Sequence, residues 1–266
     1  MRQTYNHIDL YKELDKTNCR KCLEQTCLAF AAAVVRGDRR LEECPYVDDA
    51  TKERFGSPQP ARAAREEEEE RTMAGLRQMV RSVDLAASAE RLGAEFNGET
   101  LTIKSLGKDF HVDASGNIVS KCHVHEWVTG PLLNYVVSCS GKDPSGSWVP
   151  LRELKNGADW GPLFGQRCEK PLKQVADKHT DLFALMVDVF SAKSAPDSFD
   201  SDIAVVLSPL PRVPILICYW EPDDGLDSAL NLFFDDTAEE NLNIESIYAL
   251  GAGLALMFEK VAESHG

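Results

Sequence analysis

The sequence predicts an α+β protein in which a small helical module precedes a mixed α+β domain with a mainly antiparallel sheet. Two observations support this prediction. Four of the eight cysteines lie between residues 19 and 44, and the others are scattered at positions 122, 139, 168 and 218. From about residue 94 the apolar residues alternate with polar ones in several short segments, which is typical of half-buried strands. No strand–helix–strand rhythm is visible among these segments, so a parallel sheet is not expected.

The composition favours a globular protein and excludes two classes of partner. Of the 266 residues 43% are hydrophobic, and 29 basic against 43 acidic residues give a net charge of −14. Basic and acidic residues balance over 1–58, so the remainder of the chain carries the whole negative charge. Such a surface repels phosphate groups, which excludes nucleic acid and anionic membranes as expected partners.

Targeting signals are not apparent in the sequence. No apolar run approaches the roughly 20 residues that span a bilayer. The segment that begins at Met1 lacks the apolar stretch of a secretory signal. We therefore expect a cytoplasmic protein, in which cysteines are reduced and a cysteine cluster indicates metal binding or catalysis.

The chain is expected to have three parts. The predicted module covers residues 1–55, a helical linker covers 56–80, and the α+β domain covers 81–266. The breaker-rich segment Gly56–Pro60 marks the boundary, and the helix formers of Ala61–Val80 include the solvated run Glu66–Glu70.

Within the larger domain, three alternating segments predict an antiparallel meander, and three more strands and four helices are expected after it. The strands are expected over 100–104, 109–113, 118–122, 202–207, 214–220 and 229–234, and the helices over 131–139, 167–177, 181–190 and 244–262.

The first four cysteines, Cys19, Cys22, Cys27 and Cys44, have the spacing C-x2-C-x4-C-x16-C. Four thiolates at such spacing can surround a compact cubane cluster. The third begins an apolar helical segment whose N-terminus directs its partial positive charge toward the thiolates. Arg20 and Lys21 lie inside the loop and offset the negative charge of a ligated cluster. The sequence therefore favours an iron–sulfur site here.

Two alternatives remain open for these cysteines. A structural zinc site is one, although zinc sites favour two closely spaced cysteine pairs and here the second pair is separated by sixteen residues. Two disulfides are the other, although a cytoplasmic location disfavours them.

The segment Asn18–Val34, together with Cys44-Pro45, closely resembles the four-cysteine module of corrinoid iron–sulfur proteins, the methyl carriers of the reductive acetyl-CoA pathway. A related module occurs in an electron-transport complex subunit. The resemblance covers residues 8–48 and implies that the four cysteines bind one [4Fe–4S] cluster. Arg20 and Leu23 depart from the family pattern, since relatives usually have glycine at both positions.

The remainder resembles an uncharacterised domain that accompanies this module in anaerobic bacteria and archaea. The resemblance supports a two-domain organisation and leaves the chemistry of this domain open. It rests on the segments 148–154, 162–168, 213–220, 230–235 and 243–248.

The candidate cofactor ligands of the larger domain are His123, His125, Gly251 and Gly253. The two histidines are expected at the end of a strand, where residues i and i+2 share a face, so both could bind a transition metal or the lower axial position of a corrinoid cobalt. Ordinary strand histidines are the alternative. The two glycines permit either close helix packing or the approach of a large flat ligand.

Other features of this domain allow both a functional and a structural interpretation. The acidic segment Glu221–Asp227 fits either a hard-cation site or a plain turn. Cys139, Cys168 and Cys218 are expected to be small buried hydrophobes. Five aromatic residues could line a pocket or fill the core, namely Trp127, Tyr135, Trp148, Trp160 and Trp220.

Several catalytic and cofactor signatures are absent from the sequence. It contains no dinucleotide-binding, Walker A or nucleophile-elbow motif. Asp109 and His111 begin the corrinoid-binding D-x-H-x-x-G signature, but Ala114 stands at the glycine position. Any corrinoid is therefore expected to bind in another mode.

The leading hypothesis is a soluble iron–sulfur protein that exchanges low-potential electrons with a redox partner protein and passes them to a cofactor in the second domain. The resemblance makes a corrinoid (cobalamin) the expected cofactor. The alternative is a non-enzymatic protein for metal or partner binding and delivery, in which the cluster is structural or sensory and His123, His125 and Asp227 recognise a metal. Whether the chain is an enzyme stays open, because no catalytic constellation is apparent.

Overall fold

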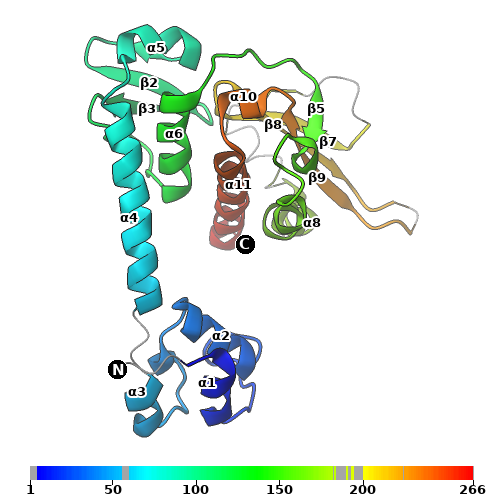
Figure 1. Ribbon diagram of the computed structural model, residues 1–266. Coiled ribbons are helices and arrows are strands. Elements are labelled where there is room, and N and C mark those ends of the chain that lie inside the picture. The colour runs from blue at the N-terminus through cyan, green and yellow to red at the C-terminus, as the bar shows by residue number, and fades with distance from the viewer. Residues whose placement is uncertain are drawn as a thin grey trace. The chain divides into compact units, whose positions relative to one another are not determined.

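The computed structural model describes residues 5–55, 60–181, 183, 190, 193–194, 200–223 and 225–265. The chain divides into two compact units, residues 1–74 and 75–266. The fold is α+β, as predicted: a helical N-terminal part is followed by a mixed region that contains two antiparallel sheets (Figure 1). Among the described residues no helix has the length and apolar character needed to cross a membrane.

The first unit consists of short helices joined by ordered loops. They are α1 (His7–Glu13), α2 (Cys27–Arg36), the single 3-10 turn η1 (Leu41–Glu43), α3 (Asp49–Phe55) and the beginning of α4 (Pro60–Val80). The side chain of Thr26 accepts the Ala29 amide and starts α2, and Gly37, with φ +82°, ends it. The sequence therefore specifies both ends of α2 locally.

The core of this unit is small and apolar. Tyr5 closes one side of it, with its hydroxyl donating to the carbonyl oxygen of Phe55 and its ring 4.7 Å from the Phe55 ring. Two thiols, those of Cys22 and Cys27, are part of the core. The remaining buried members are Leu10, Leu14, Phe30, Ala31, Val34, Leu41, Val47 and Phe55.

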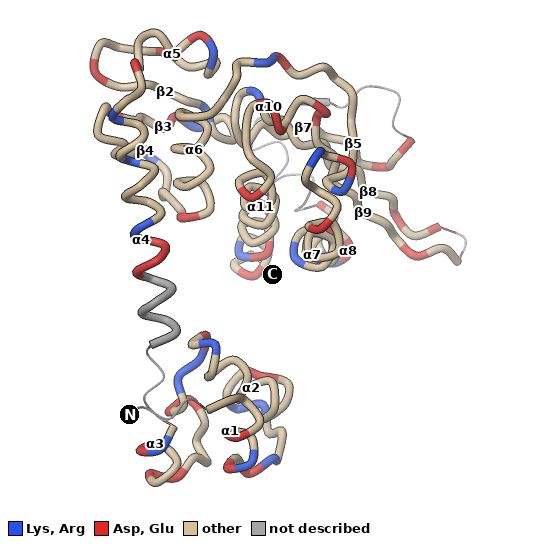
Figure 2. The backbone as a smooth tube through the Cα atoms, in the orientation of Figure 1, with Lys and Arg blue, Asp and Glu red and all other residues tan. Residues whose placement is uncertain are grey.

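Helix α4 lies where the sequence predicts a solvated helix. Residues 67–70, a run of glutamates, are exposed and form the acidic segment of this helix in Figure 2. The expected boundary at residues 56–59 lies outside the described residues.

The first sheet is the predicted meander. The strands β1 (Glu95–Phe96), β2 (Thr100–Ser105), β3 (Lys108–Asp113) and β4 (Ile118–Ser120) pair in sequence order and are all antiparallel. One face buries Leu101, Ile103, Phe110 and Val112, as the alternation requires. The helix α5 (Leu85–Leu92) contacts β1 and β2.

The second sheet has the strand order β5-β9-β8-β7-β6. Its central strand β8 (Val213–Trp220) is buried along nearly its whole length. Its neighbours are β7 (Ile203–Leu210) and β9 (Ala229–Asp235), and its edges are β5 (Trp148–Pro150) and β6 (Lys193–Ser194). The three strands predicted after residue 200 are therefore confirmed, with slightly extended ends.

The helices of the second unit differ from the prediction at two starts. Helix α6 (Glu126–Ser138) begins five residues before Pro131, where the sequence analysis placed its start. The helix tolerates the proline although it removes the hydrogen bond to the Trp127 carbonyl. The predicted helix over 167–177 is the end of a longer helical segment, which consists of α7 (Gly161–Phe164), the π-helical turn η3 (Gly165–Glu169) and α8 (Lys170–Lys178).

The remaining helical elements complete the second unit. The closing helix α11 (Ile244–His265) is as predicted and packs on α6, α8 and η3. It follows the short turns η2 (Leu151–Glu153) and α10 (Ala238–Asn241). Of the helix predicted over 181–190, only residues 181, 183 and 190 are described.

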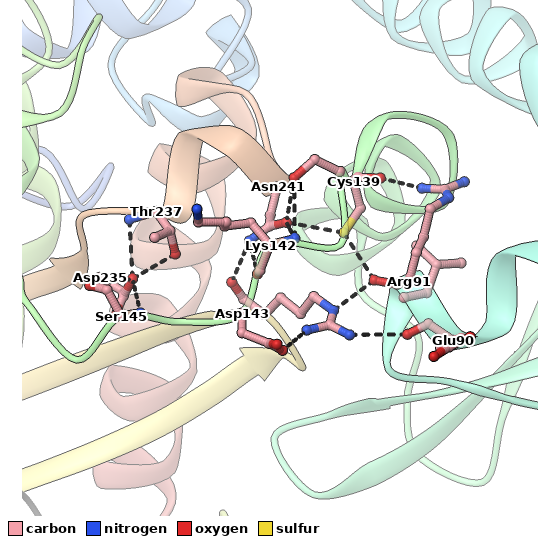
Figure 3. A network of polar contacts seen from close by, with 12 residues as sticks. Glu90, Arg91, Cys139, Lys142, Asp143, Ser145, Asp235, Thr237 and Asn241 are labelled. Carbon is pink, nitrogen blue, oxygen red and sulfur yellow. Dashed lines mark hydrogen bonds and ion pairs between the residues drawn. The ribbon is translucent and has the colours of Figure 1, made fainter.

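A buried polar network connects residues 139–147 to other parts of the second unit (Figure 3). The fully buried carboxylate of Asp235 accepts the amides of Ser145 (3.0 Å) and Gly146 (2.7 Å) and both the amide (3.1 Å) and the hydroxyl (2.6 Å) of Thr237. The fully buried side chain of Asn241 accepts the amide of Lys142 (3.1 Å) and donates to its carbonyl oxygen (2.9 Å). The network satisfies these buried polar groups within the chain itself.

Candidate functional site

The four N-terminal cysteines line one cavity, although sixteen residues separate the last two. The cavity is small and partly open to solvent, and its lining also includes Asn18, Thr26 and Phe30. All four cysteines are free thiols, of which Cys19 is exposed, Cys22 and Cys27 are buried and Cys44 is half-buried. The structure therefore brings together the four residues that the sequence analysis selected.

The loop that carries the first two cysteines has an unusual backbone. Lys16, Asn18, Arg20 and Leu23 have positive φ angles of 48° to 64°, the left-handed region that favours glycine. Residues with left-handed conformation between others of ordinary φ turn backbone amides toward a common side, and such amide-lined concavities hold phosphates and iron–sulfur clusters. Three of these residues, Lys16, Arg20 and Leu23, are neither glycine nor asparagine, so the chain adopts a glycine-like backbone here without glycine.

Backbone amides also act on the thiols. The amide of Lys21 lowers the pKa of Cys19, and it does so more strongly than the partial burial that opposes it. Burial raises the pKa of Cys44, the amide of Tyr46 opposes this, and the negative charges of the other three thiols raise the pKa further. The four sulfurs therefore interact electrostatically, and a bound cation would relieve their repulsion and hold them as thiolates.

Side chains join the segments that carry the cysteines. The side chain of Asn18 accepts the amide of Cys27 at 2.8 Å. Lys21 Nζ donates to Tyr46 Oη at 2.6 Å and lies 4.9 Å from the centre of that ring, which connects the first cysteine loop to the segment after the fourth cysteine. The sequence analysis missed the roles of Asn18 and Tyr46. Asparagine tolerates the left-handed conformation well, which is a signal that could have identified Asn18.

Four cysteine sulfurs are a donor set for either an iron–sulfur cluster or a single zinc ion. Four zinc-bound sulfurs at 2.3 Å would lie about 3.8 Å from one another. Within the described part of the chain, no three His, Cys, Asp or Glu side chains are placed as ligands of a single ion. Four cysteines around one cavity are the donor set that an iron–sulfur cluster requires.

The two histidines of the second unit lie side by side but not on a strand. Strand β4 ends at Ser120, and His125 is the N-cap residue of α6, so the expected strand position is wrong. The ring centres of His123 and His125 are 4.3 Å apart, and the His125 ring stacks on Trp127 at 6.4 Å. Partial burial, followed by the charges of His123 and Lys260, lowers the pKa of His125. A short loop thus presents two adjacent imidazoles.

Aromatic rings fill the space over the two glycines of α11. A Cβ atom at Gly251 would lie 2.6 Å from the Phe164 ring, and one at Gly253 would lie 2.1 Å from the Trp127 ring. The glycines therefore allow close packing of these rings on α11, and a flat ligand could reach either glycine only by displacing a ring.

The acidic segment after β8 forms a tight turn. Asp223 and Leu226 exchange backbone hydrogen bonds, and Asp227 is exposed. The described residues of this turn belong to no metal-ligand group. Cys139, Cys168 and Cys218 are buried, and burial raises the pKa of Cys168 to about 12. These residues therefore pack as small apolar side chains, as predicted.

Four of the five aromatic candidates of this unit take part in its packing or its hydrogen bonds, namely Trp127, Tyr135, Trp160 and Trp220. Tyr135 is fully buried and donates to the Leu92 carbonyl at 2.9 Å, while Trp160 packs on Tyr248. The indole nitrogen of Trp148 is buried, and within the described structure it has no hydrogen-bond partner.

Two family matches were found, and each falls within one of the two compact units of the chain. Residues 14–46 match the family described as "Putative Fe-S cluster", so this part of the first unit is similar to an iron–sulfur module. Residues 84–257, more than half of the chain, match "Domain of unknown function (DUF3786)". The chain belongs to the DUF3786 family.

Its curated relatives are similar in the module alone. The "Corrinoid/iron-sulfur protein large subunit" of Moorella thermoacetica is 48% identical over 46 residues, 17% of this chain and 10% of the relative. The "Acetyl-CoA decarbonylase/synthase complex subunit gamma" of Methanothermobacter thermautotrophicus is 42% identical over 40 residues, 15% of this chain and 9% of the relative. The chain thus spans about a tenth of the length of these relatives. No solved structure matches.

Proposed function

We propose that Cys19, Cys22, Cys27 and Cys44 bind one [4Fe–4S] cluster and that the protein transfers single electrons. The four free thiols that line one cavity under a loop with left-handed residues carry this proposal. When bound, such a cluster supplies single electrons at a potential that depends on net charge, exposure and hydrogen bonds to its sulfurs. The amides of Lys21 and Tyr46 and the exposure of Cys19 are the features of this chain that set these quantities.

The experiment is anaerobic purification followed by metal analysis and a redox titration. We expect iron and sulfide, four of each per chain as the cluster formula requires, together with a brown chromophore that is reduced reversibly by one electron. Cys27→Ser should lose the chromophore, whereas the control Cys122→Ser, which changes an exposed cysteine outside the cavity, should keep it. Stoichiometric zinc without a chromophore would contradict the proposal. A cluster that cannot be reduced reversibly would instead support a structural or sensory role in metal or partner delivery.

We further propose that the electrons reach a corrinoid held by the second unit, with His123 or His125 at its lower axial position. The similarity of the module to one subunit whose name includes a corrinoid supports this, as do the two adjacent imidazoles. The rings over Gly251 and Gly253 argue that the corrinoid approaches the histidines rather than the glycines.

Cobalt analysis and the absorption spectrum of the protein incubated with cob(II)alamin test the corrinoid. The double variant His123→Ala/His125→Ala should lose the bound cobalt, while His111→Ala, which changes a histidine on β3, should retain it. A wild-type protein that binds no cobalamin would remove the corrinoid from the proposal and leave the cluster unaffected.

A further inference from the structure

Large apolar side chains are exposed next to the cysteines of the first unit. Leu23 (79% exposed), Leu28 (41%) and Tyr46 (44%) lie within two residues of the second, third and fourth cysteine of the motif. Single exposed apolar residues need no explanation, but a group of them around one site indicates an interaction surface. The exposed hydrophobics of this unit are thus concentrated at the proposed cluster.

Leu23 is the most informative of these residues. Its φ of +64° is a conformation that glycine adopts without steric cost and leucine does not. Its side chain gains little from the fold, because most of it faces solvent. Neither backbone preference nor core packing therefore explains a leucine here. A strained residue without a structural benefit points to a contact made outside the chain's own fold.

The cluster edge would reach the surface within this same group. Cys19 is the exposed member of the four cysteines. Electron transfer requires that two redox centres come close, so a partner must dock where the ligands are most accessible. The exposed thiol, Leu23 and Tyr46 all belong to, or directly adjoin, the segments that line the cavity.

Basic residues outnumber acidic ones in the loop 15–24 that carries the first two cysteines. Lys16, Arg20 and Lys21 are exposed on the loop, and Asp15 is the acidic residue beside them. Glu24, on the same side, is paired with Arg39 at 3.4 Å. This local excess of positive charge contrasts with the net charge of −14 of the whole chain. Complementary charge sets which partner approaches and how fast.

We propose that this surface, here called the docking face, binds a small electron-carrier protein whose exposed redox centre has an acidic rim. The docking face consists of Cys19, Arg20, Lys21, Leu23, Leu28 and Tyr46. The apolar residues supply the contact and the basic residues orient the partner. One electron passes from the reduced carrier, which is oxidised, to the cluster, which is reduced. This inference rests on the proposed cluster.

The test is stopped-flow reduction of the full-length, cluster-loaded protein by flavodoxin hydroquinone, an acidic carrier. Iron content and the absorption spectrum are measured first for every variant. Wild-type second-order rate constants should fall as salt rises. Arg20→Glu and Leu23→Gln should each lower the rate constant about tenfold at low salt. The controls Arg36→Glu and Ile8→Gln, which change an exposed arginine and an exposed isoleucine of the same unit, should leave it unchanged.

The outcomes separate this inference from the cluster proposal. A wild-type protein without a cluster removes both. A normal cluster with equal rate constants in all variants, or a faster rate in Arg20→Glu, overturns the docking face alone. Sedimentation of the wild type as a dimer that Leu23→Gln dissociates would assign the surface to a second copy of the chain and also overturn the proposal.

Discussion

The two units of this protein stabilise their structures in different ways. In the first unit, four residues of the cysteine loop have left-handed backbone, and two of the buried core side chains are thiols of proposed ligands. In the second unit, a strand that is buried along nearly its whole length lies at the centre of a sheet, and the chain's own donors satisfy the buried carboxylate of Asp235. The first unit thus keeps two thiols of the proposed site in its core, whereas the second unit satisfies the buried Asp235 carboxylate with its own donors.

The small size of the first unit gives a physical reason why a bound group would contribute more to its stability than to that of the second unit. Domains of about 60 residues or fewer bury too little surface to be more than marginally stable. A bound metal group adds its binding free energy to folding, because the unfolded chain has no preformed site. The following expectations test the contrast in order of decreasing effect.

Loss of the cluster should have the largest effect. Cys27→Ser removes a buried ligand at the first residue of α2, so we expect residues 5–55 to lose their cooperative structure while the second unit keeps its thermal transition. Limited proteolysis combined with calorimetry measures both units. Cys122→Ser is the control and should resemble the wild type. If the first unit without iron still resists proteolysis, its apolar core is sufficient for folding, and the two units do not differ in this respect.

Removal of the Asp235 carboxylate should destabilise the second unit next most strongly. Asp235→Ala leaves the amides of Ser145 and Gly146 and both donors of Thr237 without partners, at a cost of about 3 kcal/mol or more. Urea unfolding measures this loss. Asp236→Ala, which changes an exposed neighbour, should cost less than about 1 kcal/mol. Equal effects of the two variants would mean that the network is not what secures this unit.

The same carboxylate should make the second unit sensitive to acid. Burial by itself would raise the pKa of Asp235, but hydrogen bonds from Thr237, Ser145 and Gly146 outweigh it and lower the pKa. A lowered native pKa gives stability that is fully present above the ordinary carboxyl value of about 3.9 and is lost as the pH falls through the native value. Urea unfolding from pH 6 to pH 3 should therefore show the wild type approaching Asp235→Ala. If the difference in the free energy of unfolding between wild type and Asp235→Ala stays constant over this pH range, the Asp235 carboxylate is not the source of the acid sensitivity.

Close packing on α11 should be sensitive to one added methyl group. Gly253→Ala places a Cβ atom 2.1 Å from the Trp127 ring, and the resulting displacement should cost about 1–3 kcal/mol. Gly75→Ala is the matched control, because nothing lies within 4 Å of its Cβ position in α4 and alanine should stabilise that helix by about 0.5–1 kcal/mol. Chemical denaturation measures both the expected loss of stability in Gly253→Ala and the expected gain in Gly75→Ala. A neutral Gly253→Ala would show that the space over this glycine is available to a ligand after all.

Relief of backbone strain in the cysteine loop should have the smallest effect. Leu23→Gly removes a left-handed leucine, so we expect the cluster-loaded first unit to gain about 0.5–1 kcal/mol, the difference between the left-handed penalty and the entropy of glycine. Leu28→Gly, which places glycine inside α2, should instead lose about 1 kcal/mol. Hydrogen exchange of the loop and of α2 measures the two changes. Destabilisation by Leu23→Gly would mean that the leucine contributes to the fold.

Much of the fold could be predicted from local patterns. Strict alternation identified β2, β3 and β4, and the apolar segment 214–220 identified the central strand β8. The start of α6 could not be predicted, because Pro131 at the first helical turn is the usual arrangement and here it lies inside the helix. The π-helical turn at Gly165–Glu169 has no reliable sequence signal.

The candidate sites show the same limit. The spacing of the first four cysteines predicted a shared site, and the structure places them around one cavity. The assumption that His123 and His125 share a strand face was wrong, yet the loop still brings their rings within 4.3 Å. Asparagine's tolerance of left-handed backbone could have singled out Asn18, but no local signal indicated that it would accept the Cys27 amide or that Lys21 would reach Tyr46.

Cysteine spacing and hydrophobic alternation are properties of neighbouring residues, so the candidate ligands and the strands β2–β4 and β7–β9 could be predicted before the fold was known. Which surfaces are free depends instead on how distant elements pack. Trp127 covers Gly253 and Phe164 covers Gly251, although each pair is far apart in the chain. Such contacts depend on how two distant helices pack, and a glycine looks the same in the sequence whether a ligand or a ring lies above it.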